Sequence, residues 1–152
     1  MPITTTWGWA TWSRVWDEID FKCSDYNPKS LNKYKFNFSN SYNFARLLDM
    51  QLNGHKVSSW GIRFYFNVFN KNGIVLYPDK TLVKNIGWDN SGRHGANFQL
   101  HSSSTWANDY KIEVFPFPKL NHIFTKLNVR YLKWENSAFV KIFKKFFIII
   151  KI

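Results

Sequence analysis

The chain has 152 residues, of which 45% are hydrophobic and 20% aromatic, so its composition excludes a disordered chain and its length fits one domain. Lys and Arg total 21 against 10 Asp and Glu, and the net charge of +11 favours an anionic partner without choosing among nucleic acid, phospholipid and sugar diphosphate. The single cysteine, Cys23, excludes an internal disulfide and a cysteine metal cluster, and it suits a reducing compartment such as the cytoplasm.

Neither end of the sequence predicts export or a membrane span. The first residues lack the basic and apolar regions of a secretory signal. The longest apolar run near the end, residues 146–150, is far shorter than the roughly 20 residues that a spanning helix needs. We therefore expect a cytoplasmic protein that does not cross a bilayer by itself.

Helical periodicity dominates the first half of the chain. Apolar residues at i, i+3, i+4 and i+7 predict a short amphipathic helix over 10–19, followed by a polar loop over 23–39. Further helices are predicted over 42–53 and 59–71, each closed by an Asn-Gly pair.

The second half mixes strand and loop signals. Short β-rich runs predict strands over 74–77 and 81–85, and another over 111–115. A loop with three glycines spans 85–97, and helices are predicted over 121–134 and 139–152. This order of helix, glycine, strand and proline is typical of an α/β protein.

Three segments in this order resemble the C-terminal, acceptor-side half of bacterial inverting sugar transferases of glycosyltransferase family 2. They are WGWATWSRVW at Trp7–Trp16, SWGIRFY at Ser59–Tyr65, and NGIVLYP from Asn72 continued by LVKNIGWDNSGRH at Leu82–His94. The resemblance covers roughly residues 7–117. It implies an α/β fold, a partial GT-A architecture with helices packed on an incomplete mixed sheet. The expected domains are 1–118, the acceptor-side part, and 119–152, a basic helical tail.

The resemblance also implies a reaction. A sugar passes from a nucleoside diphosphate sugar to a hydroxyl of a saccharide acceptor, a surface polysaccharide or lipopolysaccharide precursor, with inversion at the anomeric carbon. In the complete enzyme, Mg²⁺ or Mn²⁺ held by an Asp-x-Asp motif neutralises the leaving diphosphate. This chain has no such motif, and its nearest mimic, Glu18 to Asp20, is better explained as a solvated helix end.

The catalytic base is a second departure from the family pattern. Gly61 stands where many members carry an acidic residue, and glycine cannot accept a proton, so Asp89 is the alternative candidate. His94 is a candidate metal or phosphate ligand in the glycine-rich loop. With the donor-binding half absent, we expect the chain to be inactive alone.

Substrate-binding candidates come from the same motifs. Indole rings stack on the apolar faces of sugars, and guanidinium groups match diphosphate or an acidic acceptor sugar. For Trp12 and Trp16, packing in a core is the better explanation, and for Arg63 a structural salt bridge is an equal alternative. The substrate-binding candidates are Trp7, Gly8, Trp9, Arg14, Ser59, Trp60, Arg63, Ser91 and Gly92.

Two other partners deserve weight. Residues 139–152 carry six large apolar residues on one side with four lysines beside them, which favours contact with an anionic membrane surface, and packing against another domain is the alternative. The charge and the aromatic content also suit a non-catalytic carbohydrate- or nucleic-acid-binding module. No nucleic-acid-binding motif is present, so we expect no specific nucleic acid.

Overall fold

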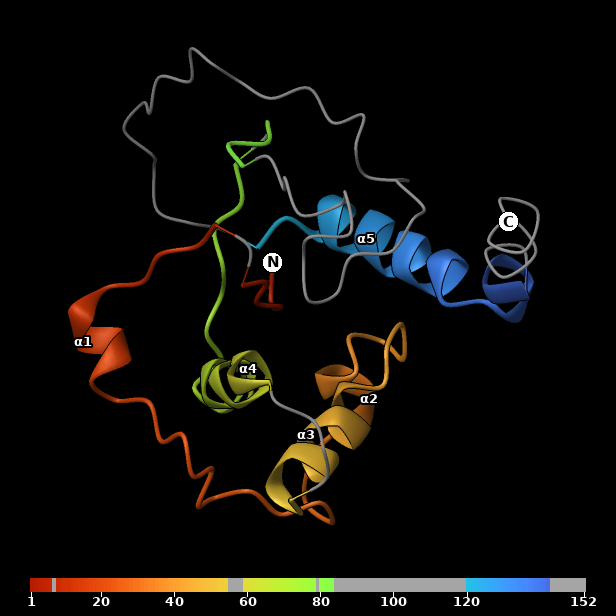
Figure 1. Ribbon diagram of the computed structural model, residues 1–152. Coiled ribbons are helices and arrows are strands. Elements are labelled where there is room, and N and C mark those ends of the chain that lie inside the picture. The colour runs from red at the N-terminus through yellow and green to blue at the C-terminus, as the bar shows by residue number, and fades with distance from the viewer. Residues whose placement is uncertain (7, 55–58, 79, 84–119, 143–152) are drawn as a thin grey trace, which may run out of the picture. The chain divides into compact units, whose positions relative to one another are not determined.

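The regular elements of the described part of the chain are helices (Figure 1). Their bounds are α1 Ser13–Trp16, α2 Lys33–Phe36, α3 Phe44–Leu52, α4 Trp60–Asn70 and α5 His122–Glu135. The structure is a computed structural model that describes residues 1–6, 8–54, 59–78, 80–83 and 120–142. Residues 138–142 are helical as well. The chain divides into one unit of Met1–Leu76 with Lys119–Asn136 and a second of Tyr77–Pro118 with Ser137–Ile152.

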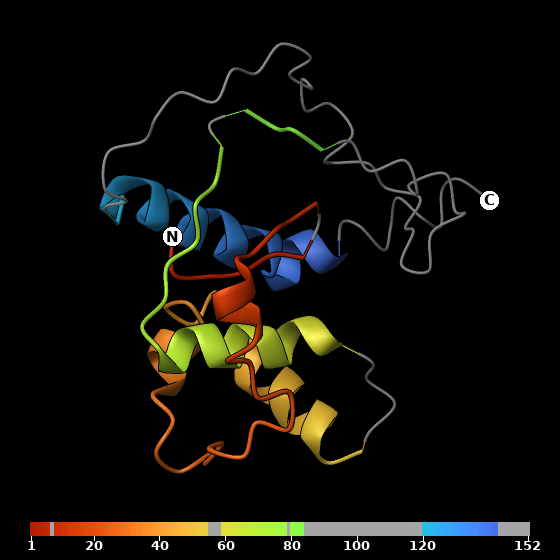
Figure 2. The same cartoon turned by 90° about the vertical axis from the view of Figure 1, so that its left-hand side faces the viewer.

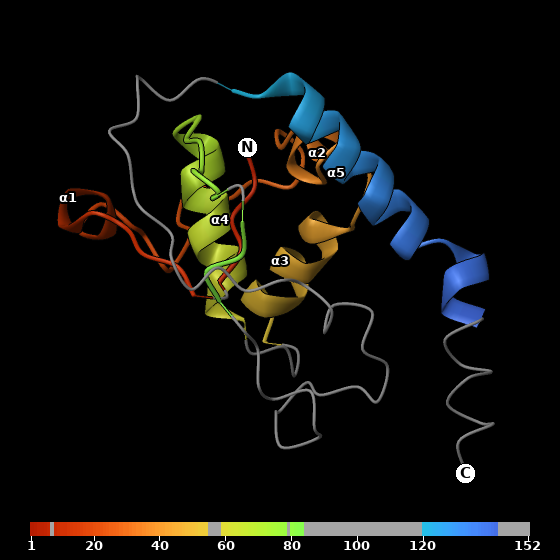
Figure 3. The ribbon, with the colours of Figure 1, turned by 90° about the horizontal axis from the view of Figure 1, so that it is seen from above.

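The core of the first unit lies where α3 contacts both α2 and α4 (Figure 3). Phe36 of α2 and Leu48 of α3 are completely buried. The ring of Phe36 stacks on Tyr65 of α4 with centroids 4.8 Å apart, and the Tyr65 hydroxyl donates a hydrogen bond of 2.8 Å to the Phe36 carbonyl. The cluster of buried residues comprises Ile3, Cys23, Phe36, Phe38, Ala45, Leu48, Ile62, Tyr65 and Phe66.

The predicted helices over 42–53, 59–71 and 121–134 are confirmed as α3, α4 and α5. The end of α4 shows why the Asn-Gly signal works. Asn72 adopts the left-handed region with φ of 51°, its N–H bonds to Phe69 O at 3.0 Å, and the N–H of Gly73 bonds to Val68 O at 2.8 Å. This pattern is the Schellman motif, which closes a helix by satisfying its last carbonyls.

The predicted α/β fold is wrong, because no sheet forms among the described residues. Residues 74–77 have no strand assignment, and Thr81 is a single bridge residue within 81–83. Val75 exchanges two hydrogen bonds with Met1, at 2.8 and 2.9 Å. These bonds join the run to the N-terminus, but a sheet requires strands that pair along their length, and residues 74–77 form no strand. The predicted strand over 111–115 lies outside the described residues.

Two local predictions also fail. Helix α1 has one turn instead of the predicted 10–19, and its N-cap residue, Trp12, makes no side-chain capping bond. The segment 23–39, predicted as a polar loop, contains α2 and buries Phe36 and Phe38. Asn32 caps α2 by accepting the N–H of Lys35 at 3.1 Å. The burial of two phenylalanine rings thus gives this segment an ordered place in the fold despite its polar composition.

Helix α5 belongs to the first unit and packs beside its core (Figure 2). Val129 and Leu132 contact the core cluster. Asn136, which follows the last turn, donates from Nδ2 to the Ser41 carbonyl at 3.3 Å. Among the described residues, no helix has the length and apolar character that a bilayer crossing requires.

Candidate functional site

Aromatic rings from two distant parts of the sequence meet in one group, here named the tryptophan cluster: Trp9, Trp16, Phe21, Trp60 and Phe64. Trp9 lies 4.9 Å from Phe64, 5.3 Å from Trp60 and 6.2 Å from Trp16, measured between ring centroids. Phe64 is buried at the base of the cluster, whereas Trp16 and Trp60 keep 44% and 46% of their surface exposed. The cluster therefore presents two indole rings to solvent.

The two exposed rings form a corner. Their centroids are 6.5 Å apart, and their planes meet at 72°. Phe21 supports Trp16 from the side with centroids 5.2 Å apart. Edge-to-face pairs of this kind stabilise each other through the ring quadrupoles. The arrangement holds both indoles in place without covering them.

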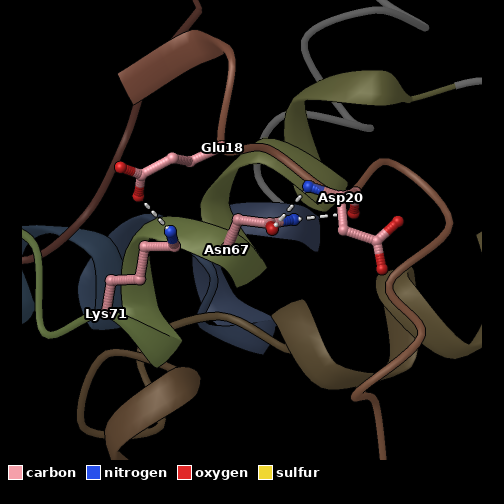
Figure 4. Close-up of polar contacts among 4 residues, drawn as sticks. All are labelled: Glu18, Asp20, Asn67 and Lys71. Carbon is pink, nitrogen blue, oxygen red and sulfur yellow. Dashed lines mark hydrogen bonds and ion pairs between the residues drawn. The ribbon is translucent and has the colours of Figure 1, made fainter. Parts of the chain in front are cut away.

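A set of polar contacts, here named the polar clamp, fixes residues 13–21, the α1 segment, on α4, as Figure 4 shows. Asn67 of α4 accepts a hydrogen bond from the N–H of Asp20 at 2.9 Å and donates one to the Asp20 carbonyl at 2.9 Å. Its side-chain amide thus bonds to both backbone polar groups of one residue. The same Nδ2 donates to Arg63 O at 2.9 Å. Farther along α4, Lys71 forms an ion pair with Glu18. These contacts hold Trp16 and Phe21 against α4.

Arg63 lies one turn after Trp60, and its guanidinium donates hydrogen bonds to backbone carbonyls. Its Nη1 donates to Phe21 O at 3.0 Å, and its Nη2 donates to Gln51 O at 3.4 Å. Its Nε is buried without a hydrogen-bond partner among the described residues. The guanidinium therefore ties the α1 segment to the end of α3, and within the described residues no carboxylate forms an ion pair with it.

The other described candidates lie within two residues of a cluster tryptophan in the sequence. Ser59 precedes α4, where its N–H bonds to Gln51 Oε1 at 2.6 Å and its side chain makes no capping bond. Arg14 is exposed, with its guanidinium carbon 5.7 Å from the centroid of the Trp12 ring. Gly8 is exposed with φ of 54°, a left-handed conformation that favours glycine. The structure thus brings Trp9, Trp60 and Arg63 together around α4.

Five candidates lie outside the described residues. These are the predicted base Asp89, the predicted metal ligand His94, and the substrate-binding candidates Trp7, Ser91 and Gly92. Their roles stay predictions.

The carboxylates nearest to an Asp-x-Asp mimic are engaged in other contacts. Asp20 accepts the backbone N–H groups of Ser24 at 2.6 Å and Lys22 at 2.8 Å, and these bonds, that of Ser24 foremost, hold its pKa below the usual range. Lys71 likewise lowers the pKa of Glu18. Among the described residues, no three His, Cys, Asp or Glu side chains gather as a metal would require.

Gly61 lies in the first turn of α4, packed against the N-terminal segment. A Cβ at this position would come within 2.9 Å of Thr6 Cγ2, a closer approach than a normal contact. The atom in the way is the methyl end of a short side chain, which can rotate. The contact with Thr6 therefore does not by itself account for the absence of an acidic residue here.

Sequence reasoning missed three residues of the site. Phe21 and Phe64 complete the ring cluster, and Asn67 joins α4 to Asp20. Phe64 falls four residues after Trp60 on the predicted helix, so their shared face was a usable signal. Nothing in the local pattern distinguishes Asn67 from a solvent-facing asparagine, because its partner lies 47 residues away.

Comparisons with protein-family models, curated proteins and solved structures found no match to this chain.

Proposed function

We propose that this chain is the acceptor-side part of a sugar transferase that uses a nucleoside diphosphate sugar, and that the tryptophan cluster binds the saccharide acceptor. One observation carries the proposal. The motif over 7–16 and the motif over 59–65 bear the resemblance to glycosyltransferase family 2, and rings from both meet in this cluster. Motifs that share a surface are expected to share a ligand.

The chemistry of the cluster suits a sugar. A pyranose has an apolar face of C–H groups that packs on indole, and hydroxyls at its edge that need polar partners. Trp16 and Trp60 offer two half-exposed rings at an angle, so one sugar unit can touch both. Phe64, by contrast, is buried beneath them.

The proposal divides the reaction between two parts of an enzyme. In this proposal, the metal and the diphosphate are bound by a donor-binding half, where the family carries its Asp-x-Asp motif. Asp89 remains the candidate base for the acceptor hydroxyl, and His94 the candidate metal or phosphate ligand. The proposed acceptor is a surface polysaccharide or lipopolysaccharide precursor, and the single cysteine, which suits a reducing compartment, supports a cytoplasmic reaction.

A binding experiment tests the acceptor site. Purified full chain is applied to an array of pyranose oligosaccharides, beside Trp16→Ala, Trp60→Ala and the matched control Trp134→Ala, an exposed tryptophan of α5. Each ring of the cluster should contribute about 1 kcal/mol, so each cluster variant should bind about fivefold more weakly. The control should bind like the wild type. Equal loss in all three variants, or binding by none of the four proteins, would contradict the proposal.

A turnover assay separates a transferase part from a non-catalytic module. When the chain is incubated with nucleoside diphosphate sugars and the saccharide that it binds, no product should form, because its 152 residues contain no Asp-x-Asp motif. Turnover by the chain alone would show that it carries its own donor site. If single-stranded nucleic acid displaces the saccharide from the chain, the nucleic-acid alternative is favoured.

A further inference from the structure

Helix α5 has two apolar sides, and only one of them faces the core. Val129 and Leu132 pack on the core cluster, and the helix contributes no fully buried residue. Ile123, Leu127 and Trp134 are 75%, 56% and 52% exposed. At about 100° per residue these three positions fall within one narrow arc of the helix, away from the core-facing pair. We call this arc the outer face of α5.

Cations line one edge of the outer face. Lys126, Arg130 and Lys133 follow each other at spacings of four and three residues, so they form a row along the helix, and all three are exposed. The only carboxylate on α5 is Glu135, in its last turn. A strip of apolar side chains thus runs beside a strip of positive charge.

We propose that the outer face of α5 binds the surface of an anionic phospholipid bilayer. Helices that lie in the membrane interface combine an apolar strip with Lys and Arg at its edge, and Trp prefers the interfacial depth. Charge complementarity selects this occupant. A second copy would bring another row of cations to the same face, and the chain as a whole has 21 basic against 10 acidic residues.

This inference does not depend on the proposed function. The tryptophan cluster is built by α1, α4 and the segment after α1, whereas the outer face belongs to α5 alone. It also differs from the predicted membrane contact of residues 139–152, because α5 ends before them. Loss of saccharide binding would leave vesicle binding intact, and the reverse holds as well.

Flotation of the full chain with vesicles tests the inference. One set of vesicles is pure phosphatidylcholine, and the other also contains phosphatidylglycerol. The charge variant replaces three cations, Lys126→Gln with Arg130→Gln and Lys133→Gln, and its control replaces three exposed lysines near α2, Lys29→Gln with Lys33→Gln and Lys35→Gln. Each basic residue at an anionic surface contributes about fivefold in partitioning, so the charge variant should lose about a hundredfold and the control far less.

The apolar strip has its own test. Ile123→Ser with Leu127→Ser removes two exposed side chains and should lower partitioning about tenfold in high salt, where the cationic contribution is screened. Leu82→Ser with Val83→Ser removes two other exposed apolar side chains and serves as control. All replaced side chains are exposed, so circular dichroism should show the same helix content in every variant.

Three results would overturn the inference. Equal binding of wild type to neutral and anionic vesicles would remove the charge argument. Equal losses in the α5 variants and their controls would remove α5 from the contact, since residues 139–152 are unchanged in all of them. An oligomer that the α5 substitutions convert to monomer, with vesicle binding unchanged, would identify the outer face as an interface between copies.

Discussion

Replacing Asn67 by aspartate should break the clamp between α4 and the α1 segment at almost constant volume. Asn67 is 8% exposed, and its Nδ2 donates to the carbonyls of Asp20 and Arg63, both at 2.9 Å. The new carboxylate keeps the bond from the Asp20 N–H but turns oxygen toward two carbonyl oxygens. Each lost hydrogen bond costs about 1 kcal/mol, and the buried repulsion raises the total to about 2–4 kcal/mol.

Urea unfolding followed by tryptophan fluorescence measures this loss. Asn128→Asp is the matched control, because Asn128 also donates from Nδ2 to a helix carbonyl, Phe124 O at 2.8 Å, but does so at the surface. The control should lose less than about 0.5 kcal/mol. Asn67→Asp should also shift the emission to the red, as Trp16 loses its support. A loss no larger than that of the control would refute the clamp.

Three further predictions follow from single contacts. Burial raises the pKa of the Cys23 thiol from 9.0 to about 11, so a thiol reagent should label Cys23 only after unfolding. The stability that the buried neutral thiol contributes should be lost as the pH rises through that range, and a pH series of urea titrations checks this loss. Lys71→Glu should weaken saccharide binding by repelling Glu18, and adding Glu18→Lys should restore it in the array assay. Gly73→Ala should cost about 1–3 kcal/mol in urea unfolding, because its Cβ would approach Val68 O to 3.0 Å, whereas Gly54→Ala meets nothing within 4 Å and should cost about 1 kcal/mol for its left-handed φ alone.

The helices that sequence reasoning found are those whose signals are local. In α3, Leu48 falls on the predicted apolar face, and Gly54, with φ of 72°, stops the helix where the Asn-Gly pair indicated. Both the 3.6-residue period and the stop lie within a few residues of one another. The same holds for α4, which ends just before the pair Asn72-Gly73. Local periodicity therefore sufficed for the three longest described helices.

The errors arose where distant partners decide the outcome. Phe36 and Phe38 lie in a polar segment, and α2 joins the core through partners distant in sequence, such as Tyr65, which is 29 residues from Phe36 and stacks on its ring. The run over 74–77 has the composition of a strand, but strand formation depends on neighbours that the composition does not reveal. The α/β expectation extended the resemblance to the whole architecture, and the described residues form helices instead.

The acidic residues before α2 show how a motif can mislead about chemistry and still locate a site. Glu18 and Asp20 resemble a metal-binding pair, yet one forms an ion pair with Lys71 and the other caps a turn through backbone N–H groups. The Glu18 carboxylate reaches Lys71 at the end of α4, whereas the Asp20 carboxylate shapes the turn whose backbone bonds to Asn67 (Figure 4). This attachment keeps Trp16 beside Trp60. Because the pKa of each carboxylate is lowered, both carboxylates are ionised at neutral pH, and the contacts that they make weaken only as the pH falls through those pKa values. If the tryptophan cluster binds saccharide as proposed, the affinity should therefore decline in acid, and the array assay repeated at falling pH measures this.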